Sequence, residues 1–174
     1  ALPILALMAV LSLFWTPFST TVLGEHPRFL PPGWPHVLGT DSFGSDTFSL
    51  LLVGARVVLM VGVIAVGIAA LVGVPLGIAA AQAPAWASEV LLRATDVAYA
   101  FPALLLAILL AGVFGGSTGT AMTAIGVATI PQFVRIARAG TLQVISSDFV
   151  LAARACGTGR FAIAGRHVLP NIAP

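Results

Sequence analysis

Charged residues are scarce in this sequence. They make up 8% of its 174 residues, and because lysine is absent, all eight basic residues are arginines. A soluble domain carries charge on about a quarter of its residues, so this composition excludes a soluble globular domain with a polar shell. Without lysine runs, or basic residues interleaved with aromatic ones, the sequence also argues against nucleic acid as a partner.

Several catalytic and structural devices are missing as well. The single cysteine, Cys156, excludes an internal disulfide and a cysteine metal cluster. No segment matches the nucleotide-binding pattern G-x-x-x-x-G-K-[ST]. The six acidic residues are scattered and form no paired-carboxylate or Ser-His-Asp arrangement. We therefore expect that the chain is not an enzyme and that it has no catalytic, cofactor-binding or metal-binding residues.

Long apolar stretches dominate what is present. Hydrophobic residues account for 59% of the chain, and its mean hydropathy is +1.06. A spanning helix needs about 20 mostly apolar residues, and three charge-free stretches reach that length: residues 1–24, 57–88 and 97–134. As one helix the third would measure about 57 Å, nearly twice the bilayer core. It must fold back, and Gly115–Gly119 is the obvious turn.

The sequence therefore predicts an all-α integral membrane protein, a polytopic helical bundle. Four spans are expected, the first at 1–24 and the others near 57–81, 98–114 and 120–138. Residues 25–56 are predicted to form an extracytoplasmic loop, rich in proline and glycine, and the start of the second span.

The arginines set the predicted orientation. Residues 135–166 hold five arginines against the single Asp148, whereas residues 25–56 hold three acidic residues against two arginines. Positive charge stays on the cytoplasmic side, so the segment after the fourth span is predicted to be cytoplasmic. Counting back through four spans places the N-terminus in the cytoplasm too, in a multi-pass protein of the cell (inner or plasma) membrane.

Two connections carry more local predictions. In the cytoplasmic connection at 82–97, Ser88 is predicted to cap a short helix, in which Glu89 and Arg93 form an i,i+4 pair. In the first loop, Asp41 and Asp46 are predicted to form turns and helix caps, because the oxygen-ligand pattern of a calcium loop is absent.

Three residues at the edges of the spans or inside them are candidates for a pathway or a gate. Asp96 lies at the mouth of the third span, where an acid either lines the pathway or belongs to a solvated interfacial helix. Pro102 and Pro131 bend helices and free a backbone carbonyl, which suits a gate and equally suits static packing.

The segment at 145–171 is a polar helix–turn–helix in an otherwise apolar chain. Its small residues share one helix face and let another surface approach closely: Ala152, Ala153, Cys156 and Gly157. Gly157 and Gly159 are predicted to end the helix, and Arg154 and Arg160 project from other faces toward acidic groups on a partner. The residues alone fit a docking helix and an amphipathic helix lying on anionic lipid equally well.

Two segments have a spacing that is typical of one family. The first contains Ala-Ala, three residues and Gly, followed by Leu-Pro: Ala152, Ala153, Gly157, Leu169 and Pro170, with Arg166-His167 before that pair and Asn171 after it. The second, His36–Asp46, is similar to His-Pro-Leu-Gly-Thr-Asp-x-x-Gly-Arg-Asp, with Val37 and Ser45 in place of proline and arginine. Both resemble permease subunits of ABC transporters, of the dipeptide/oligopeptide/nickel branch.

The resemblance covers residues 36–174 and implies the type I importer permease fold, with 57–174 as the permease core. It implies that 145–171 is a cytoplasmic coupling loop that docks on an ATPase, and that two further spans follow Pro174. The implied coupling residues are Asp148, Leu151, Ala152, Ala153, Arg154, Gly157 and Arg160. Leu151 departs from the family, which has glutamate there.

The resemblance also implies partners and a transport function. Relatives assemble with a second homologous permease, two ATPase subunits that bind ATP and Mg²⁺, and an extracytoplasmic binding protein. The expected function is translocation of peptides, or of similar small solutes such as nickel chelates or glutathione. The alternative is a channel or ion-coupled carrier subunit, which requires a relay of ionisable residues inside the membrane, and the predicted spans contain almost none.

Overall fold

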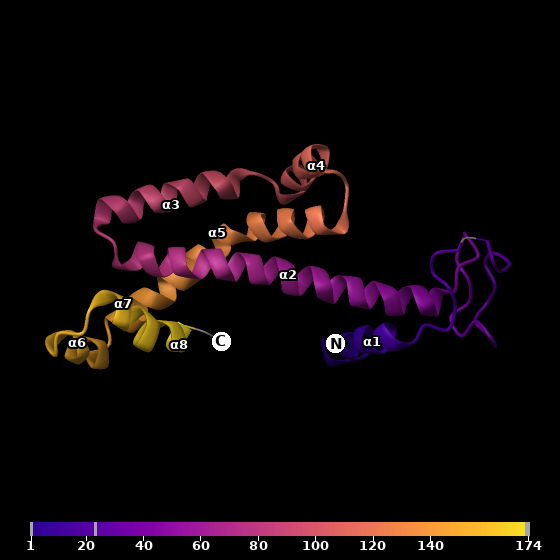
Figure 1. The fold of residues 1–174 in the computed structure, drawn as a ribbon, viewed down its shortest axis with the longest axis horizontal. Coiled ribbons are helices and arrows are strands. Elements are labelled where there is room, and N and C mark those ends of the chain that lie inside the picture. The colour runs from indigo at the N-terminus through magenta and orange to yellow at the C-terminus, as the bar shows by residue number, and fades with distance from the viewer. Residues whose placement is uncertain (1, 23, 173–174) are drawn as a thin grey trace. The chain divides into compact units, whose positions relative to one another are not determined.

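The computed structural model describes residues 2–22 and 24–172. Every regular element in these residues is a helix, apart from an isolated bridge between Thr40 and Asp46, so the predicted all-α fold class is confirmed. The helices (Figure 1) are α1 (Leu2–Phe14), α2 (Thr47–Gln82), α3 (Ala85–Ala100), α4 (Ala103–Phe114), α5 (Thr118–Ile145), α6 (Asp148–Ala155), α7 (Arg160–Ile163), the π-helix η1 (Ala164–Val168) and α8 (Leu169–Ile172). The chain divides into two compact units, residues 1–63 and 64–174.

In the first unit, α1 is shorter than the span predicted at 1–24. It has 13 residues, about 20 Å at 1.5 Å per residue, whereas the bilayer core is about 30 Å thick. Residues 15–22 leave the helix, because Pro17 cannot continue it and the serine and threonine that follow favour turns. Residues 1 and 23 of the predicted range lie outside the described residues.

The loop before α2 is folded back on itself at two glycines. Gly39 and Gly44 have φ of +73° and +77°, a left-handed region that side chains rarely adopt. A Cβ at either position would also collide with a backbone carbonyl, that of Leu30 or of His26. These residues must therefore be glycine for the loop to close.

Asp41 and Asp46 form the turn and the cap predicted for them. Asp41 Oδ1 accepts hydrogen bonds from the backbone N–H groups of Phe43 and Ser45, both at 2.8 Å. Asp46 Oδ2 accepts from the backbone N–H and the hydroxyl of Ser49, both at 2.8 Å, and so caps α2. The cap begins α2 at Thr47, ten residues before the predicted span at 57.

The carboxyl of Asp46 also holds a histidine. Its Oδ1 lies 3.0 Å from His36 Nδ1, with both side chains buried, and the His36 ring packs at a tilt against the rings of Phe18 and His26, with 4.5 Å between centroids. Burial raises the pKa of Asp46, but the hydrogen bonds from Ser49 and His36 lower it by more, so its pKa lies below 3.8. The folded loop therefore prefers the charged carboxylate.

Acid should loosen this loop through Asp46. As the pH falls, the unfolded chain takes up the proton first, so stability from Asp46 is complete above pH 3.8 and is lost as the pH falls through the lower folded pKa. Asp46→Asn should lower the protection of the loop against hydrogen exchange by about 1.5–3 kcal/mol at pH 7. It should also remove the fall in protection below about pH 4. Equal protection profiles for both proteins would contradict this role.

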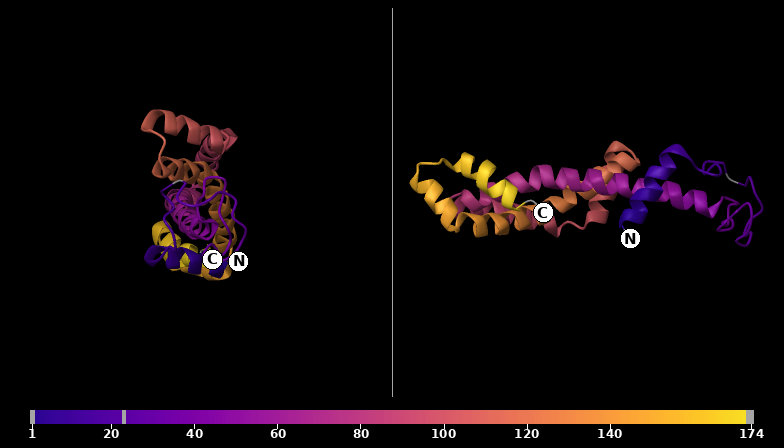
Figure 2. Two further views of the ribbon diagram at one scale, coloured as in Figure 1. Left: turned by 90° about the vertical axis from the view of Figure 1, so that its right-hand side faces the viewer. Right: turned by 90° about the horizontal axis from the view of Figure 1, so that it is seen from below.

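In the second unit, α2 and α5 pack closely where α2 carries glycine. A Cβ at Gly73 would lie 2.6 Å from Phe133 Cβ, and one at Gly77 would lie 2.5 Å from the Val134 carbonyl oxygen. Figures 1 and 2 show α5 crossing this part of α2. Small residues allow such close backbone approach between membrane helices. The predicted span 57–81 lies within α2, which extends from Thr47 to Gln82 and contains Pro75.

The predicted span at 98–114 is two helices rather than one. α3 ends at Ala100, α4 begins at Ala103, and their axes are bent by 79°. The residue before a proline avoids the helical region, and Phe101, which precedes Pro102, is extended at φ −77° and ψ 119°.

The predicted cap at Ser88 is wrong. Pro84 is the N-cap residue. Ser88 is buried inside α3, where its backbone N–H donates a hydrogen bond to the Pro84 carbonyl.

The predicted glycine turn joins α4 to α5. Gly115 has φ of +87°, and the Ser117 hydroxyl accepts from the backbone N–H of Thr120 to cap α5. α5 extends to Ile145, beyond the predicted span 120–138. Among the described residues, α2 and α5 are long and apolar enough to cross a membrane, and the bent pair α3–α4 makes a third candidate. The count of four spans stays a prediction.

Candidate functional site

The polar segment predicted at 145–171 folds as a helix, a turn and a second helical stretch. α6 follows α5 after two serines, with Asp148 in its first turn and Arg154 in its last, where each charge complements the helix dipole. After the turn, α7, η1 and α8 run without a break from Arg160 to Ile172. The π-helical step in η1, where the Leu169 N–H bonds to the Ala164 carbonyl, comes directly before Pro170.

Gly157 ends α6 in the way the sequence predicts. Its φ is +84°, and two hydrogen bonds close the helix: the Gly157 N–H to the Arg154 carbonyl at 2.9 Å and the Thr158 N–H to the Ala153 carbonyl at 3.0 Å. This pair of bonds is a Schellman motif, which requires a left-handed residue after the helix. A Cβ at Gly157 would meet nothing within 4 Å, so the demand for glycine is conformational.

The inner face of α6 is held by a small apolar cluster. Val150 is fully buried and packs with Ile163 and Val168, and partly buried residues complete the cluster: Ile78, Val144, Ile145 and Ile172. The Phe149 ring also lies 6.1 Å from the ring of His167. The cluster fixes α6 against the end of α2, the end of α5 and the helical stretch after the turn.

The outer face of α6 is uncovered. Six of the seven predicted coupling residues are exposed: Asp148, Leu151, Ala152, Arg154, Gly157 and Arg160. Ala153 is half-buried, and Cys156 is exposed beside Gly157. Leu151, with half of its surface exposed, makes α6 partly apolar on its open side. A small-residue face with an exposed leucine is a surface that another protein can approach closely.

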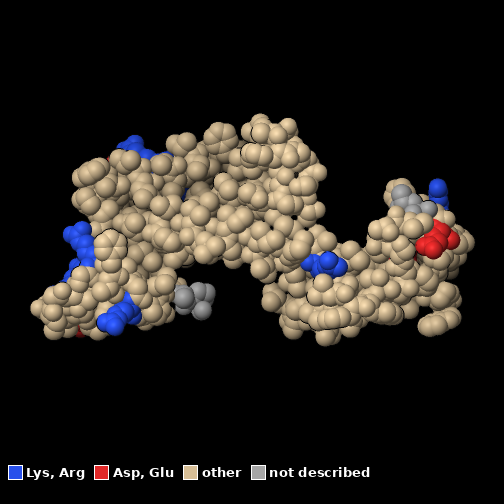
Figure 3. Space-filling view, viewed as in Figure 1, with Lys and Arg blue, Asp and Glu red and all other residues tan. Residues whose placement is uncertain are grey.

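Basic side chains surround this face. On the side shown in Figure 3, some of the basic side chains lie over α6 and α7. Among the described residues, no ion pair includes Arg154, Arg160 or Arg166. These arginines, with Asp148 as the one acid between residues 136 and 172, give the site a positive charge that favours an acidic partner surface.

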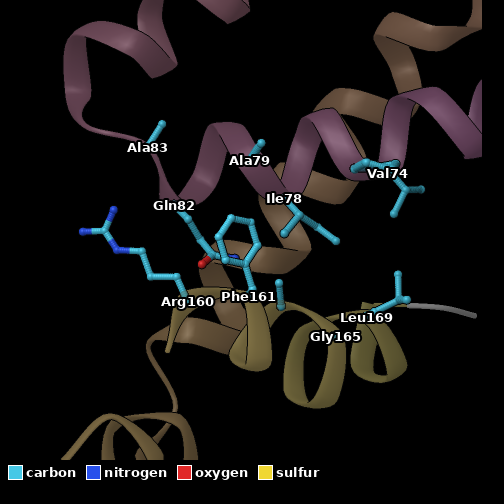
Figure 4. Close-up of a pocket in the computed structure, with 11 residues that line it drawn as sticks. Val74, Ile78, Ala79, Gln82, Ala83, Arg160, Phe161, Gly165 and Leu169 are labelled. Atoms are coloured by element: carbon cyan, nitrogen blue, oxygen red, sulfur yellow. The ribbon is translucent and has the colours of Figure 1, made fainter. Parts of the chain in front are cut away.

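A separate apolar groove of about 580 Å³ lies between the end of α2 and the stretch after the turn (Figure 4). Its walls are mostly aliphatic, and Gln82 and Arg160 lie at one end. The Phe161 ring extends toward α2 and is 95% exposed, so the groove is open. Sequence analysis did not identify this groove, because its two walls come from segments that are about 80 residues apart.

The three predicted pathway residues do not gather at α6. Asp96, in α3, forms an ion pair with Arg135 of α5, an interaction that the sequence analysis missed. Pro102 is exposed at the N-cap of α4, and Pro131 is buried inside α5. Among the described residues, no group of three His, Cys, Asp or Glu side chains is placed to hold a metal ion.

The fold and this site define a class of protein: an all-α membrane protein that holds a short, glycine-terminated helix at the end of its apolar helices. Comparison with known families narrows the class. Residues 73–174 match the model of the "binding-protein-dependent transport system inner membrane component" family. The chain belongs to this family, as its resemblance to ABC-transporter permeases predicted.

Individual relatives are similar over most of the chain. It is 34% identical to a dipeptide transport system permease protein of Alkalihalophilus pseudofirmus, over 95% of the chain and 54% of that relative. It is 39% identical to a glutathione transport system permease protein of Escherichia coli O6:K15:H31, and 35% identical to one of Pectobacterium atrosepticum. Each of these two matches covers 80% of the chain and 46% of the relative. The chain thus spans about half the length of these relatives.

Proposed function

We propose that the chain is part of a membrane-spanning permease subunit of an ATP-driven ABC importer. It takes peptides or similar small solutes from a binding protein and carries no catalytic activity of its own. The relatives are named as dipeptide and glutathione transport permeases, which supports small peptides as the substrate class.

The observation that carries this proposal is α6. Its inner face is fixed by the Val150 cluster and its end is fixed by the Gly157 turn, while the outer face stays free. A helix held this rigidly transmits a push on its outer face to α5. The proposed binding partner of the outer face of α6 is an ATPase subunit. The other partners are a second homologous permease, a second ATPase and the binding protein, and the ATPases hold ATP and Mg²⁺.

The rival functions have less support. An amphipathic helix on lipid presents a broad apolar face to the membrane, whereas the open side of α6 carries Asp148, Arg154 and small residues beside Leu151. An ion-coupled carrier needs free ionisable groups in its spans. Asp96, at the mouth of the predicted third span, is paired with Arg135.

The proposal is tested by purifying the tagged, full-length subunit from membranes and measuring ATP-driven uptake in vesicles. We expect an ATPase pair to co-purify and uptake to require both ATP and the binding protein. A subunit that purifies without an ATPase and conducts solutes without ATP would refute the proposal and favour a channel.

The proposed orientation has its own prediction. We place the loop at 25–50 outside the cell, and α6 and the N-terminus in the cytoplasm. In a Cys156→Ser background, an impermeant thiol reagent added outside should label Trp34→Cys and miss Thr158→Cys. Trp34 is 94% exposed, so labelling there is not limited by burial. The reverse labelling pattern would overturn this orientation.

Leu151→Glu tests how far the resemblance of α6 to relatives extends. Leu151 is half-exposed, so the variant should fold with a change in stability within about 0.5 kcal/mol. We expect substrate-stimulated ATPase activity of the complex to stay within about threefold, because relatives carry glutamate there and Arg154, three residues further along α6, can offset its charge. Complete loss of stimulation in an intact complex would show that the ATPase surface has adapted to leucine.

A further inference from the structure

One arginine joins α3 to α5 in the second unit. Arg135 Nη2 donates to Asp96 Oδ1 at 2.6 Å, and the Arg135 guanidinium carbon lies 4.9 Å from the centre of the Tyr99 ring. Asp96 and Tyr99 are three positions apart in α3 and therefore share a face. A single side chain from α5 thus holds two side chains on one turn of α3, by charge and by cation–π contact.

Arg135 is also connected to α6 through its own helix. It lies ten residues before the end of α5, about 15 Å along the axis. α5 is continuous over this distance, and α6 begins three residues after its end. Val150 of α6 packs against Val144 and Ile145 at the end of α5, so a displacement of α6 can reach Arg135 through α5.

The two residues of α3 that contact Arg135 lie next to the bend between α3 and α4. Asp96 and Tyr99 lie in the last two turns of α3, directly before the 79° bend at Phe101 and Pro102. Phe101 and Pro102 alone connect α3 to α4. The position of the end of α3 therefore decides where α4 begins.

Both partners of this ion pair are partly exposed, so the pair can separate and re-form. Its side chains are 49% and 60% exposed, and ion pairs this open are weak in water because solvent screens them. Next to apolar helices the local dielectric constant is lower, and separating the charges becomes costlier. The pairing also leaves Asp96 without the free negative charge that a cation-binding pathway residue needs.

We propose that Asp96, Arg135 and Tyr99 form a latch that positions the α3–α4 bend relative to α5, so that movement of α6 reaches the bend. This inference rests on the proposed function of α6. Asp96 and Arg135 act as positioning residues, and neither is required to contact substrate. The latch predicts that its loss reduces the substrate moved per ATP hydrolysed, while assembly and basal ATP hydrolysis continue.

The test uses the complete transporter in vesicles and measures substrate imported per ATP. Asp96→Asn and Arg135→Gln should each lower this ratio about tenfold, with basal ATPase activity and subunit composition within about twofold of the parent. Asp96→Glu should retain most of the ratio, and the charge swap Asp96→Arg with Arg135→Asp should recover at least half of what each neutral variant loses. Glu89→Gln is the matched control, because it breaks the exposed Glu89–Arg93 pair within α3 alone and should have no effect.

The outcomes separate the latch from the proposed function. If the parent transporter imports substrate with ATP and both neutral variants keep the normal ratio, the latch is refuted and the function stands. If the neutral variants import less substrate per ATP and the charge swap does not restore this ratio in an intact complex, the Asp96–Arg135 pairing is not the cause of the loss. The latch is then again refuted. If the parent itself shows no ATP-driven import, the proposed function fails first.

Discussion

Replacing Gly157 with leucine should abolish coupled transport while leaving the protein in the membrane. Gly157 has φ of +84°, and an L-residue pays about 1–2 kcal/mol in the left-handed region. The strain falls on the two hydrogen bonds that close α6, so the helix end should fray and the docking face should lose its shape. We expect import to fall at least tenfold, with insertion and expression close to the parent.

Gly159→Leu is the matched control for this prediction. Gly159 lies two residues further along, has an ordinary φ of −70°, and a Cβ there would also meet nothing within 4 Å. It should retain at least half of the import activity. Equal losses in both variants would mean that added bulk on this surface matters and that the turn does not. Normal import by Gly157→Leu with the ATPase still bound would remove Gly157 from the coupling mechanism.

Replacing Gly77 with valine should prevent the second unit from folding correctly. The added Cβ would lie 2.5 Å from the Val134 carbonyl oxygen and 2.7 Å from Ala137 Cβ. Neither atom is the end of a flexible side chain, so α5 must move away from α2, and overpacking of this kind costs about 3 kcal/mol or more. We expect little detergent-stable subunit, measured as monodisperse protein after size-exclusion chromatography.

Gly67→Val separates this packing effect from a general intolerance of α2. Gly67 lies in the same helix, and a Cβ there would meet nothing within 4 Å. The yield of monodisperse protein should equal that of the parent. If Gly77→Val also gives a normal yield and melting temperature, the close approach of α2 and α5 is not required for stability.

Features encoded by a few neighbouring residues could be predicted from the sequence. Gly115 and Gly157 have the positive φ values expected of turn glycines, and Asp46 caps the helix that follows it. Each of these depends on the conformational freedom of one residue or on a hydrogen bond over three residues. The all-α class followed from apolar length in the same way.

Features that depend on distant contacts, or on a local break inside an apolar run, were missed. Mean hydropathy does not register that Phe101 leaves the helix before Pro102, so the prediction placed one helix at 98–114 where the structure has the end of α3, a bend and α4. Asp96 and Arg135 are 39 residues apart, and no periodic pattern relates them. A coupling role for the seven predicted residues depends on their contacts in the assembled transporter, so that role stays a prediction.

The most direct measurement is site-specific photocross-linking in the active transporter. A cross-linking amino acid at Ala152, on the exposed face of α6, should capture an ATPase subunit. The same residue at Val127, exposed within α5, should capture none. ATP-dependent change in the yield at Ala152 would show that the contact moves during turnover. A transporter that imports substrate with ATP and yields no ATPase adduct at Ala152 would contradict the docking of α6.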